Sequence, residues 1–135
     1  MADGADVLPA LADVHKALGA TRRCHAINLL EEFDDTPIQA SKLADHITAI
    51  EEGISPSRAS GGPYRNVYNA LCQTHLPALA DVGVIRYDSD RKTLTTGPRY
   101  PVVQLLLSLN CTAYTILQGN SGWSSPHQSP IEQGD

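Results

Sequence analysis

The chain has 135 residues, 41% of them hydrophobic, and a formal net charge of −5. This length suits one domain with appendages and a modest core, and the acidic total argues at first against a nucleic-acid partner. The first residues lack the charged and apolar stretches of a secretory signal, and three widely spaced cysteines favour reduced thiols, so we expect a cytoplasmic protein.

Two helices are expected at the start. Residues 8–18 place apolar side chains at helical spacing and are followed by Gly19. Residues 22–33 are predicted to form the second helix, with Thr21 as its N-cap and Phe33 directed inward.

A short strand and a third helix are expected next. Ile38 is predicted to form a short strand that pairs with a later hairpin. Residues 41–52 carry apolar side chains at offsets 0, 1, 4 and 7, from Leu43 to Ile50, and end at Gly53. This pattern predicts an amphipathic helix, the first of a helix-turn-helix.

A longer helix is predicted over residues 64–82, after a connection (53–62) rich in Ser, Gly and Pro that we expect to be a mobile loop. Its inward side is predicted to comprise Val67, Tyr68, Leu71, Cys72, His75, Ala78, Leu79 and Val82. Its outward side is predicted to comprise Asn66, Asn69, Gln73 and Pro77, with Arg65 at the boundary. Pro77 lacks an N–H, so we expect a kink or a break there, with Leu76 outside the apolar arc. Gly83 is expected to end the helix.

A hairpin follows at once. Residues 84–87 are β-branched and aromatic, 88–91 have turn chemistry, and 92–96 return with Leu94 inward. Two helices followed by a hairpin are typical of a winged helix-turn-helix, and residues 86–92 would form the wing.

The last predicted helix carries no charge from Val102 to Leu117. Its apolar residues recur at spacings of 4, 3, 4 and 3, which predicts a dimer interface made of Val102, Leu106, Leu109, Ala113 and Ile116. A transmembrane segment is the alternative, but the length and five polar side chains argue against it.

The expected fold class is therefore mainly α with a small β-hairpin: a winged helix-turn-helix plus a C-terminal helix. We expect the winged-helix domain over residues 7–97, the C-terminal helix over 101–118, and a disordered tail over 119–135.

Four short stretches of the chain resemble a family of small haloarchaeal winged-helix domains. They are the run His75-Leu76-Pro77-x-Leu79-x-Asp81-x-Gly83, the Arg65-x-Val67-Tyr68 opening of the long helix, Leu43-Ala44 and the pair Arg22-Arg23. The resemblance covers about Leu11 to Leu94. It implies a winged-helix fold and a role in regulating transcription, although most members have no assigned function. This chain differs from the family just before the long helix, where family members tend to carry charged residues and this chain has Ser60-Gly61-Gly62-Pro63.

The charges are unevenly distributed. Residues 1–35 carry three basic and seven acidic groups, whereas residues 36–100 carry seven basic and six acidic groups. No Asp or Glu occurs from Gly53 to Ala80, so this segment, which holds most of the predicted long helix, would not repel phosphate. Ten Asp, seven Arg and only three Lys also suggest a salt-adapted protein.

Base contacts are predicted for Arg65, Asn66, Asn69 and Gln73, because Arg pairs with guanine, and Asn and Gln with adenine, in the major groove. Contacts to the DNA backbone are predicted for Arg22, Arg23, Arg58, Arg91 and Lys92. The alternative is that each is an ordinary solvated side chain.

No metal, cofactor or enzymatic activity is predicted. Cys72 and His75 could complete a zinc set with Cys24 and His25, but no paired ligand spacing supports this, and a half-buried structural histidine explains His75 better. No phosphate-binding loop, nucleophile elbow or paired-carboxylate motif occurs.

The sequence therefore favours a cytoplasmic homodimer that binds double-stranded DNA and regulates transcription. The alternative is a winged-helix module for protein–protein contact, which the acidic total and the uncharged C-terminal helix favour.

Overall fold

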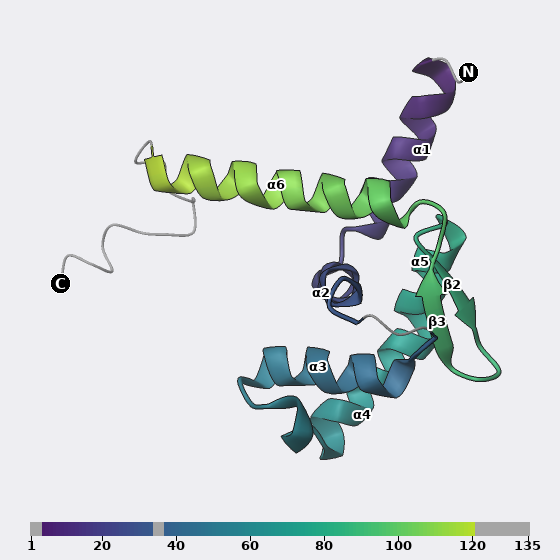
Figure 1. The fold of residues 1–135 in the computed structure, drawn as a ribbon, viewed down its shortest axis with the longest axis vertical. Coiled ribbons are helices and arrows are strands. Elements are labelled where there is room, and N and C mark those ends of the chain that lie inside the picture. Colours follow the sequence, from purple (N-terminus) through teal and green to yellow (C-terminus); the bar gives the residue numbers. More distant parts are fainter. Residues whose placement is uncertain (1–3, 34–36, 121–135) are drawn as a thin grey trace. The chain divides into compact units, whose positions relative to one another are not determined.

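A computed structural model describes residues 4–33 and 37–120, and Figure 1 shows its helices and strands. Within these residues the chain is mainly helical, with one small antiparallel sheet, so the predicted fold class is confirmed: a winged helix-turn-helix with a C-terminal helix. The elements in order are α1 Gly4–Ala17, α2 Thr21–Leu30, β1 Ile38–Gln39, α3 Ala40–Glu52, the 3₁₀ turn η1 Pro56–Arg58, α4 Gly61–Ala70, the π-helical segment η2 Leu71–His75, α5 Leu76–Asp81, β2 Ile85–Asp88, β3 Thr93–Thr96 and α6 Tyr100–Asn120.

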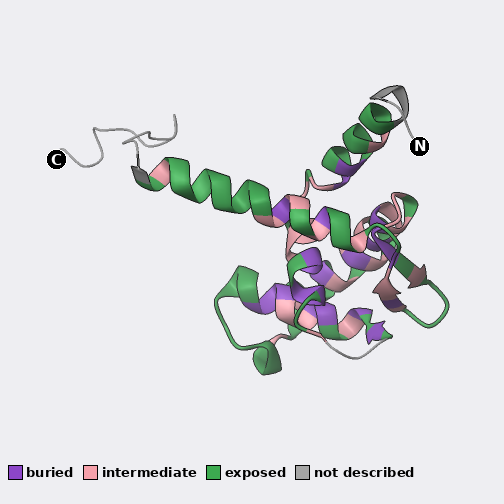
Figure 2. Ribbon diagram, turned by 45° about the horizontal axis from the view of Figure 1, so that its top comes forward, coloured by how far each residue is buried: buried purple, intermediate pink, exposed green. Residues whose placement is uncertain are grey.

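The core forms where α3 packs against α2 and α4. Buried residues concentrate there, as the purple segments of Figure 2 show. The largest fully buried side chains are Ile27, Leu43, Ile47, Val67, Leu71, Leu76, Leu79, Val84, Ile85, Leu94 and Val103, all apolar, together with Thr48. Leu, Ile and Val thus supply most of the burial in a chain with few aromatic residues.

The long helix, residues 61–81, is continuous through α4, η2 and α5, and its π-helical segment ends at His75, two residues before Pro77. Proline cannot donate to the carbonyl four residues back, and the wider turn accommodates the missing bond. The buried positions Val67, Leu71, Leu76 and Leu79 are separated by four, five and three residues. The five-residue spacing, from Leu71 to Leu76, is the one that spans the π-helical segment. The prediction that Leu76 lies outside the apolar arc was therefore wrong: this side chain is fully buried.

The sheet has the order β1-β3-β2, and both pairs are antiparallel. Leu94 of β3 lies opposite Ile38 on one side and Tyr87 on the other, so the predicted third strand at Ile38 is confirmed. Gly97 follows β3 where the chain passes close to the start of the hairpin. A Cβ at this glycine would lie 2.5 Å from the carbonyl oxygen of Gly83.

Three local predictions were wrong. Thr21 is the first residue of α2 rather than its cap, and the residue before it, Ala20, makes no side-chain capping bond. The helix ends at Leu30, so Phe33 lies beyond it and makes an edge-to-face contact with the ring of His46. Ile50 is 49% exposed although it follows the apolar pattern of α3.

The chain divides into two compact units, Met1–Gln104 and Leu105–Asp135. Only the first turn of α6 belongs to the first unit, where the Tyr100 hydroxyl donates to the carbonyl oxygen of Ile27 over 3.2 Å. By length and composition α6 could also cross a membrane, over Tyr100–Gly119 with a mean hydropathy of 1.3, which is weak evidence by itself. The tail predicted to be disordered lies outside the described residues from 121 onward.

Candidate nucleic-acid interface

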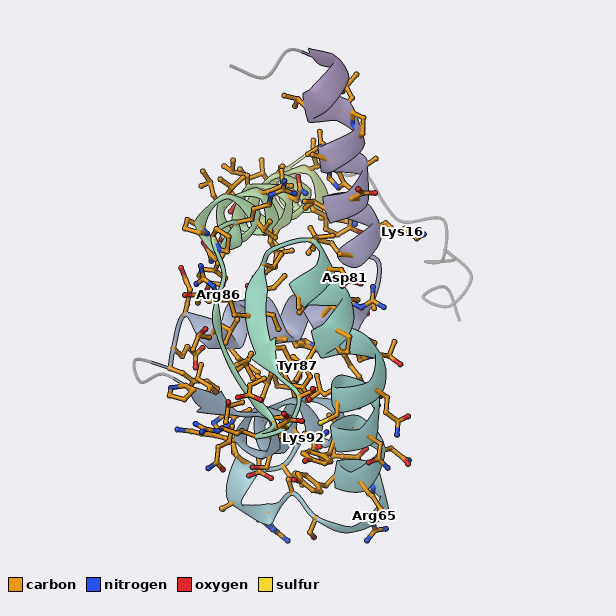
Figure 3. All side chains as sticks on the ribbon, turned by 90° about the vertical axis from the view of Figure 1, so that its right-hand side faces the viewer. Lys16, Arg65, Asp81, Arg86, Tyr87 and Lys92 are labelled. Atoms are coloured by element: carbon orange, nitrogen blue, oxygen red, sulfur yellow. The ribbon has the colours of Figure 1, made fainter. Side chains whose placement is uncertain are left out.

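The outer side of the long helix carries four exposed polar side chains, which we call the polar stripe: Arg65, Asn66, Asn69 and Gln73. Figure 3 shows Arg65 at the outer side of α4. Within the described part of the chain, none of the four side chains makes a hydrogen bond to another protein group. Their donors and acceptors are therefore available to a ligand.

The polar stripe continues into the π-helical segment. Asn69 lies one turn before Gln73, and the segment η2 begins between them. Residues four positions apart lie on the same side of a helix, so both side chains belong to the outer side.

A tyrosine cluster supports the long helix from the side of the hairpin. The rings of Tyr64 and Tyr68 stack with their centroids 5.9 Å apart. Tyr87 of β2 lies between the hairpin and the long helix (Figure 3), and its hydroxyl is buried. Burial raises the pKa of Tyr87, and the thiol of Cys72 adds to the shift. The phenols therefore stay neutral and act as packing groups.

Two of the residues predicted to contact the DNA backbone, Arg22 and Arg23, donate side-chain hydrogen bonds within the protein. Arg22 forms a bidentate salt bridge with Glu51, with N···O distances of 2.6 and 2.9 Å. The hydrogen bonds from Arg22 lower the pKa of the Glu51 carboxyl. Arg23 donates to Nδ1 of His75 over 3.0 Å and to the carbonyl oxygen of Ala17 over 3.2 Å. A phosphate would have to compete with these partners.

The other three residues predicted to contact the DNA backbone are exposed, and one of them, Arg91, forms a surface salt bridge with Asp88 with an N···O distance of 3.9 Å. Arg58 lies in η1, just before the long helix, and Arg91 and Lys92 lie in the hairpin turn. The Asp88 carboxylate accepts from the backbone N–H groups of Asp90 and Arg91 over 3.0 and 3.1 Å, which fixes the turn.

The turn then passes through Lys92, whose φ of 58° is left-handed. Figure 3 shows this lysine in the hairpin, whose turn thus carries two adjacent cations.

Arg86 was missing from the predicted set. It is exposed on β2 and donates a long hydrogen bond, 3.4 Å, to the carbonyl oxygen of Thr96. Together with Arg91 it borders a shallow groove along the hairpin that also includes Pro37 and Thr93. Strand alternation, which directs Arg86 outward from buried Ile85, was the signal that could have identified it.

The residues considered for zinc do not form a site. Among the residues that the structure describes, no group of three or more His, Cys, Asp or Glu side chains is placed to hold a metal ion. His75 instead accepts from Arg23, and the thiol of Cys24 donates to the carbonyl oxygen of Leu18 over 3.3 Å.

The predicted dimer interface lies along α6. Val102 and Leu109 are 69% and 57% exposed, Ile116 and Ala113 are exposed as well, and Leu106 is half-buried. Within the described residues this helix presents the largest set of exposed apolar side chains.

Residues 15–95 match a family described as a domain of unknown function, DUF7344. The chain belongs to this family. The DUF7344 match extends from the last turn of α1 through β3, so it contains the long helix, the polar stripe and the hairpin, while α6 follows the matched segment. Neither the curated proteins nor the solved structures gave a match.

Proposed function

We propose that this DUF7344 protein is a cytoplasmic DNA-binding regulator of transcription. The long helix, residues 61–81, would be the recognition helix and lie in the major groove, with the wing, residues 86–92, beside the DNA backbone. The observation that carries the proposal is the polar stripe: four unpaired side chains suited to base edges, on the second helix of a helix-turn-helix.

Local charge supports the same surface. No acidic residue occurs between Gly53 and Ala80, so the recognition helix presents no carboxylate along this stretch to repel phosphate. Arg58 precedes the helix, and Arg91 and Lys92 occupy the wing turn. We therefore assign contacts to the DNA backbone first to these three residues, which are exposed, and only second to Arg22 and Arg23, which are half-buried and hydrogen-bonded within the protein.

Dimerisation through α6 completes the proposal. Exposed apolar side chains such as Val102, Leu109 and Ile116 lie on a helix without a charged residue, and burying them against a second copy would remove this surface from water. Two recognition helices would then read two half-sites, with a spacing set by the dimer.

The decisive experiment is a DNA-binding titration of the full-length protein with genomic fragments, from about 0.1 M salt to the molar range. Retention of a few fragments at high salt is the expected result, because hydrogen bonds to bases depend less on salt than phosphate contacts do. Failure to bind any fragment at 0.1 M salt would contradict the proposal.

A protein–protein module is the second candidate, and a specific surface favours it. Ile50 and Ile54 are exposed beside Leu29 and Ala49 in an open apolar groove between α2 and α3. On this alternative, Ile50→Asp would abolish partner capture in a pull-down, whereas Asn69→Ala would leave it intact. On the DNA proposal, the two variants would have the opposite effects on fragment binding.

A further inference from the structure

The polar stripe contains one guanidinium and three carboxamides, and this composition predicts which bases the helix would contact. We infer that the operator half-site of this protein is a block of about four base pairs, with three consecutive A·T pairs and one terminal G·C pair. This inference rests on the proposed function and adds the identity of the ligand.

The first argument is chemical. A carboxamide offers one donor and one acceptor side by side, which matches N7 and the N6 amino group of adenine. A guanidinium offers only donors, which match O6 and N7 of guanine. Asn66, Asn69 and Gln73 therefore select adenine, and Arg65 selects guanine.

The second argument is geometric. Arg65 and Gln73 are eight residues apart, which corresponds to about 12 Å along a helix. With about 3.4 Å between base pairs, this length spans between three and four base-pair steps. All four side chains are exposed, and their helical spacing keeps the whole length on the outer side of the helix.

The third argument concerns position in the helix. Arg65 and Asn66 lie in the second turn of a helix that begins at Gly61, and the N-terminal part of a recognition helix approaches base edges most closely. The guanine contact is therefore placed at one end of the block, with the adenine contacts following in the order Asn66, Asn69 and Gln73.

The test is selection of binding sequences from a random duplex library by the full-length protein, followed by titration of the selected sequence. We expect three adjacent A·T positions flanked by one guanine. Asn69→Ala and Gln73→Ala should each weaken binding between about 5-fold and 150-fold and relax the preference at one position. The matched control Asn28→Ala removes an exposed carboxamide of α2 and should leave both the affinity and the selected sequence unchanged.

Base analogues separate direct contacts from DNA shape, since A·T tracts also have a narrow minor groove. Replacing adenine by 7-deazaadenine removes N7 from the major groove, and replacing A·T by inosine·cytosine keeps an A·T-like minor groove while changing the major-groove edge. Both replacements should weaken binding. Retained binding to the inosine duplex would overturn the inference, because the minor groove would then be the surface that is read.

The outcomes also separate this inference from the proposed function. Enrichment of a G·C-rich sequence, or an unchanged preference in Asn69→Ala and Gln73→Ala, would overturn the half-site and leave DNA binding established. Enrichment of no sequence at all would overturn the proposed function itself. Thermal unfolding of each variant, compared with the wild type, shows that the replaced exposed side chains leave the fold intact.

Discussion

Arg23 donates from Nε to Nδ1 of His75 over 3.0 Å, and this contact joins α2 to the π-helical segment of the long helix. The acceptor nitrogen must be unprotonated, so the imidazole is neutral in the folded protein. Burial lowers the pKa of His75, and Arg23 and Arg22 lower it further, while Glu51 acts in the opposite direction. Protonation would place a third cation beside two arginines.

The free energy of unfolding is therefore expected to depend on pH over the range in which His75 titrates. The unfolded chain binds a proton at His75 near its ordinary pKa of 6.5, whereas the folded protein binds it only at lower pH. The unfolded state then carries more protons, so the free energy of unfolding decreases as the pH falls from about 6.5 toward the folded-state pKa. Urea unfolding at pH 8, 7, 6 and 5.5 measures this.

The matched control for this pH dependence is the variant His75→Gln, whose side chain keeps a polar acceptor but does not titrate. Its free energy of unfolding should change less with pH between 7 and 5.5. The Glu51 carboxyl does not interfere there: its pKa lies below 4.5, so its contribution is present above that pH and is lost only in stronger acid. Equal pH dependence in wild type and His75→Gln would contradict the role of this histidine.

Leu76→Ala is expected to destabilise the protein by about 2–5 kcal/mol, the usual range for a fully buried leucine. The reason is that the π-helical segment places this side chain in the core rather than in solvent. Leu8→Ala, at a site that is 66% exposed, serves as the control and should change stability by less than about 0.5 kcal/mol. Similar losses for the two variants in urea unfolding would show that Leu76 is not a core residue.

Gly97→Ala is expected to lower the free energy of unfolding by about 1–3 kcal/mol. The added Cβ would lie 2.5 Å from the Gly83 carbonyl oxygen and 3.0 Å from the Ile85 nitrogen, and both are backbone atoms that cannot rotate away. Gly62→Ala is the matched control, because nothing lies within 4 Å of its Cβ and it sits in the first turn of α4. That variant should be neutral or slightly more stable. A stable Gly97→Ala protein would mean that the hairpin start lies farther from the chain after β3.

If the protein binds DNA as proposed, the salt dependence should identify the cations that contact phosphate. Each phosphate contact changes the slope of log affinity against log salt by about 0.9. The double variant Arg91→Ala with Lys92→Ala should reduce the slope by about two, while Arg22→Ala, which removes a residue paired with Glu51, should leave it nearly unchanged. A larger change for Arg22→Ala would assign the contact to α2 instead of the wing.

The dimer proposed through α6 predicts that charges on its apolar side release monomers. Leu109→Glu with Ile116→Glu should convert the protein to a monomer in light scattering, because two carboxylates would be buried without partners. Thr115→Glu, on the polar side of the same helix, is the control and should remain dimeric. If the wild-type protein sediments with membranes and needs detergent for release, the helix spans a bilayer and the dimer assignment is wrong.

The sequence by itself determined the order of elements in the winged helix. Helical spacing in α3, the hairpin turn at Asp88 and the glycine at position 83 depend on neighbours a few residues apart, so local pattern was enough. The polar stripe was found in the same way, since Asn66, Asn69 and Gln73 recur with the helical period and need only to be exposed.

Contacts between distant residues could be decided only by the tertiary structure. The pairing of Arg22 with Glu51 and of Arg23 with His75 joins positions 29 and 52 residues apart, and no local pattern shows that these arginines are engaged. The burial of Leu76 depends on how the helix accommodates the missing hydrogen bond at Pro77, and the π-helical segment is favoured because it directs this leucine into the core. Periodicity assumes a regular helix, so it fails where packing against other elements stabilises an irregular one.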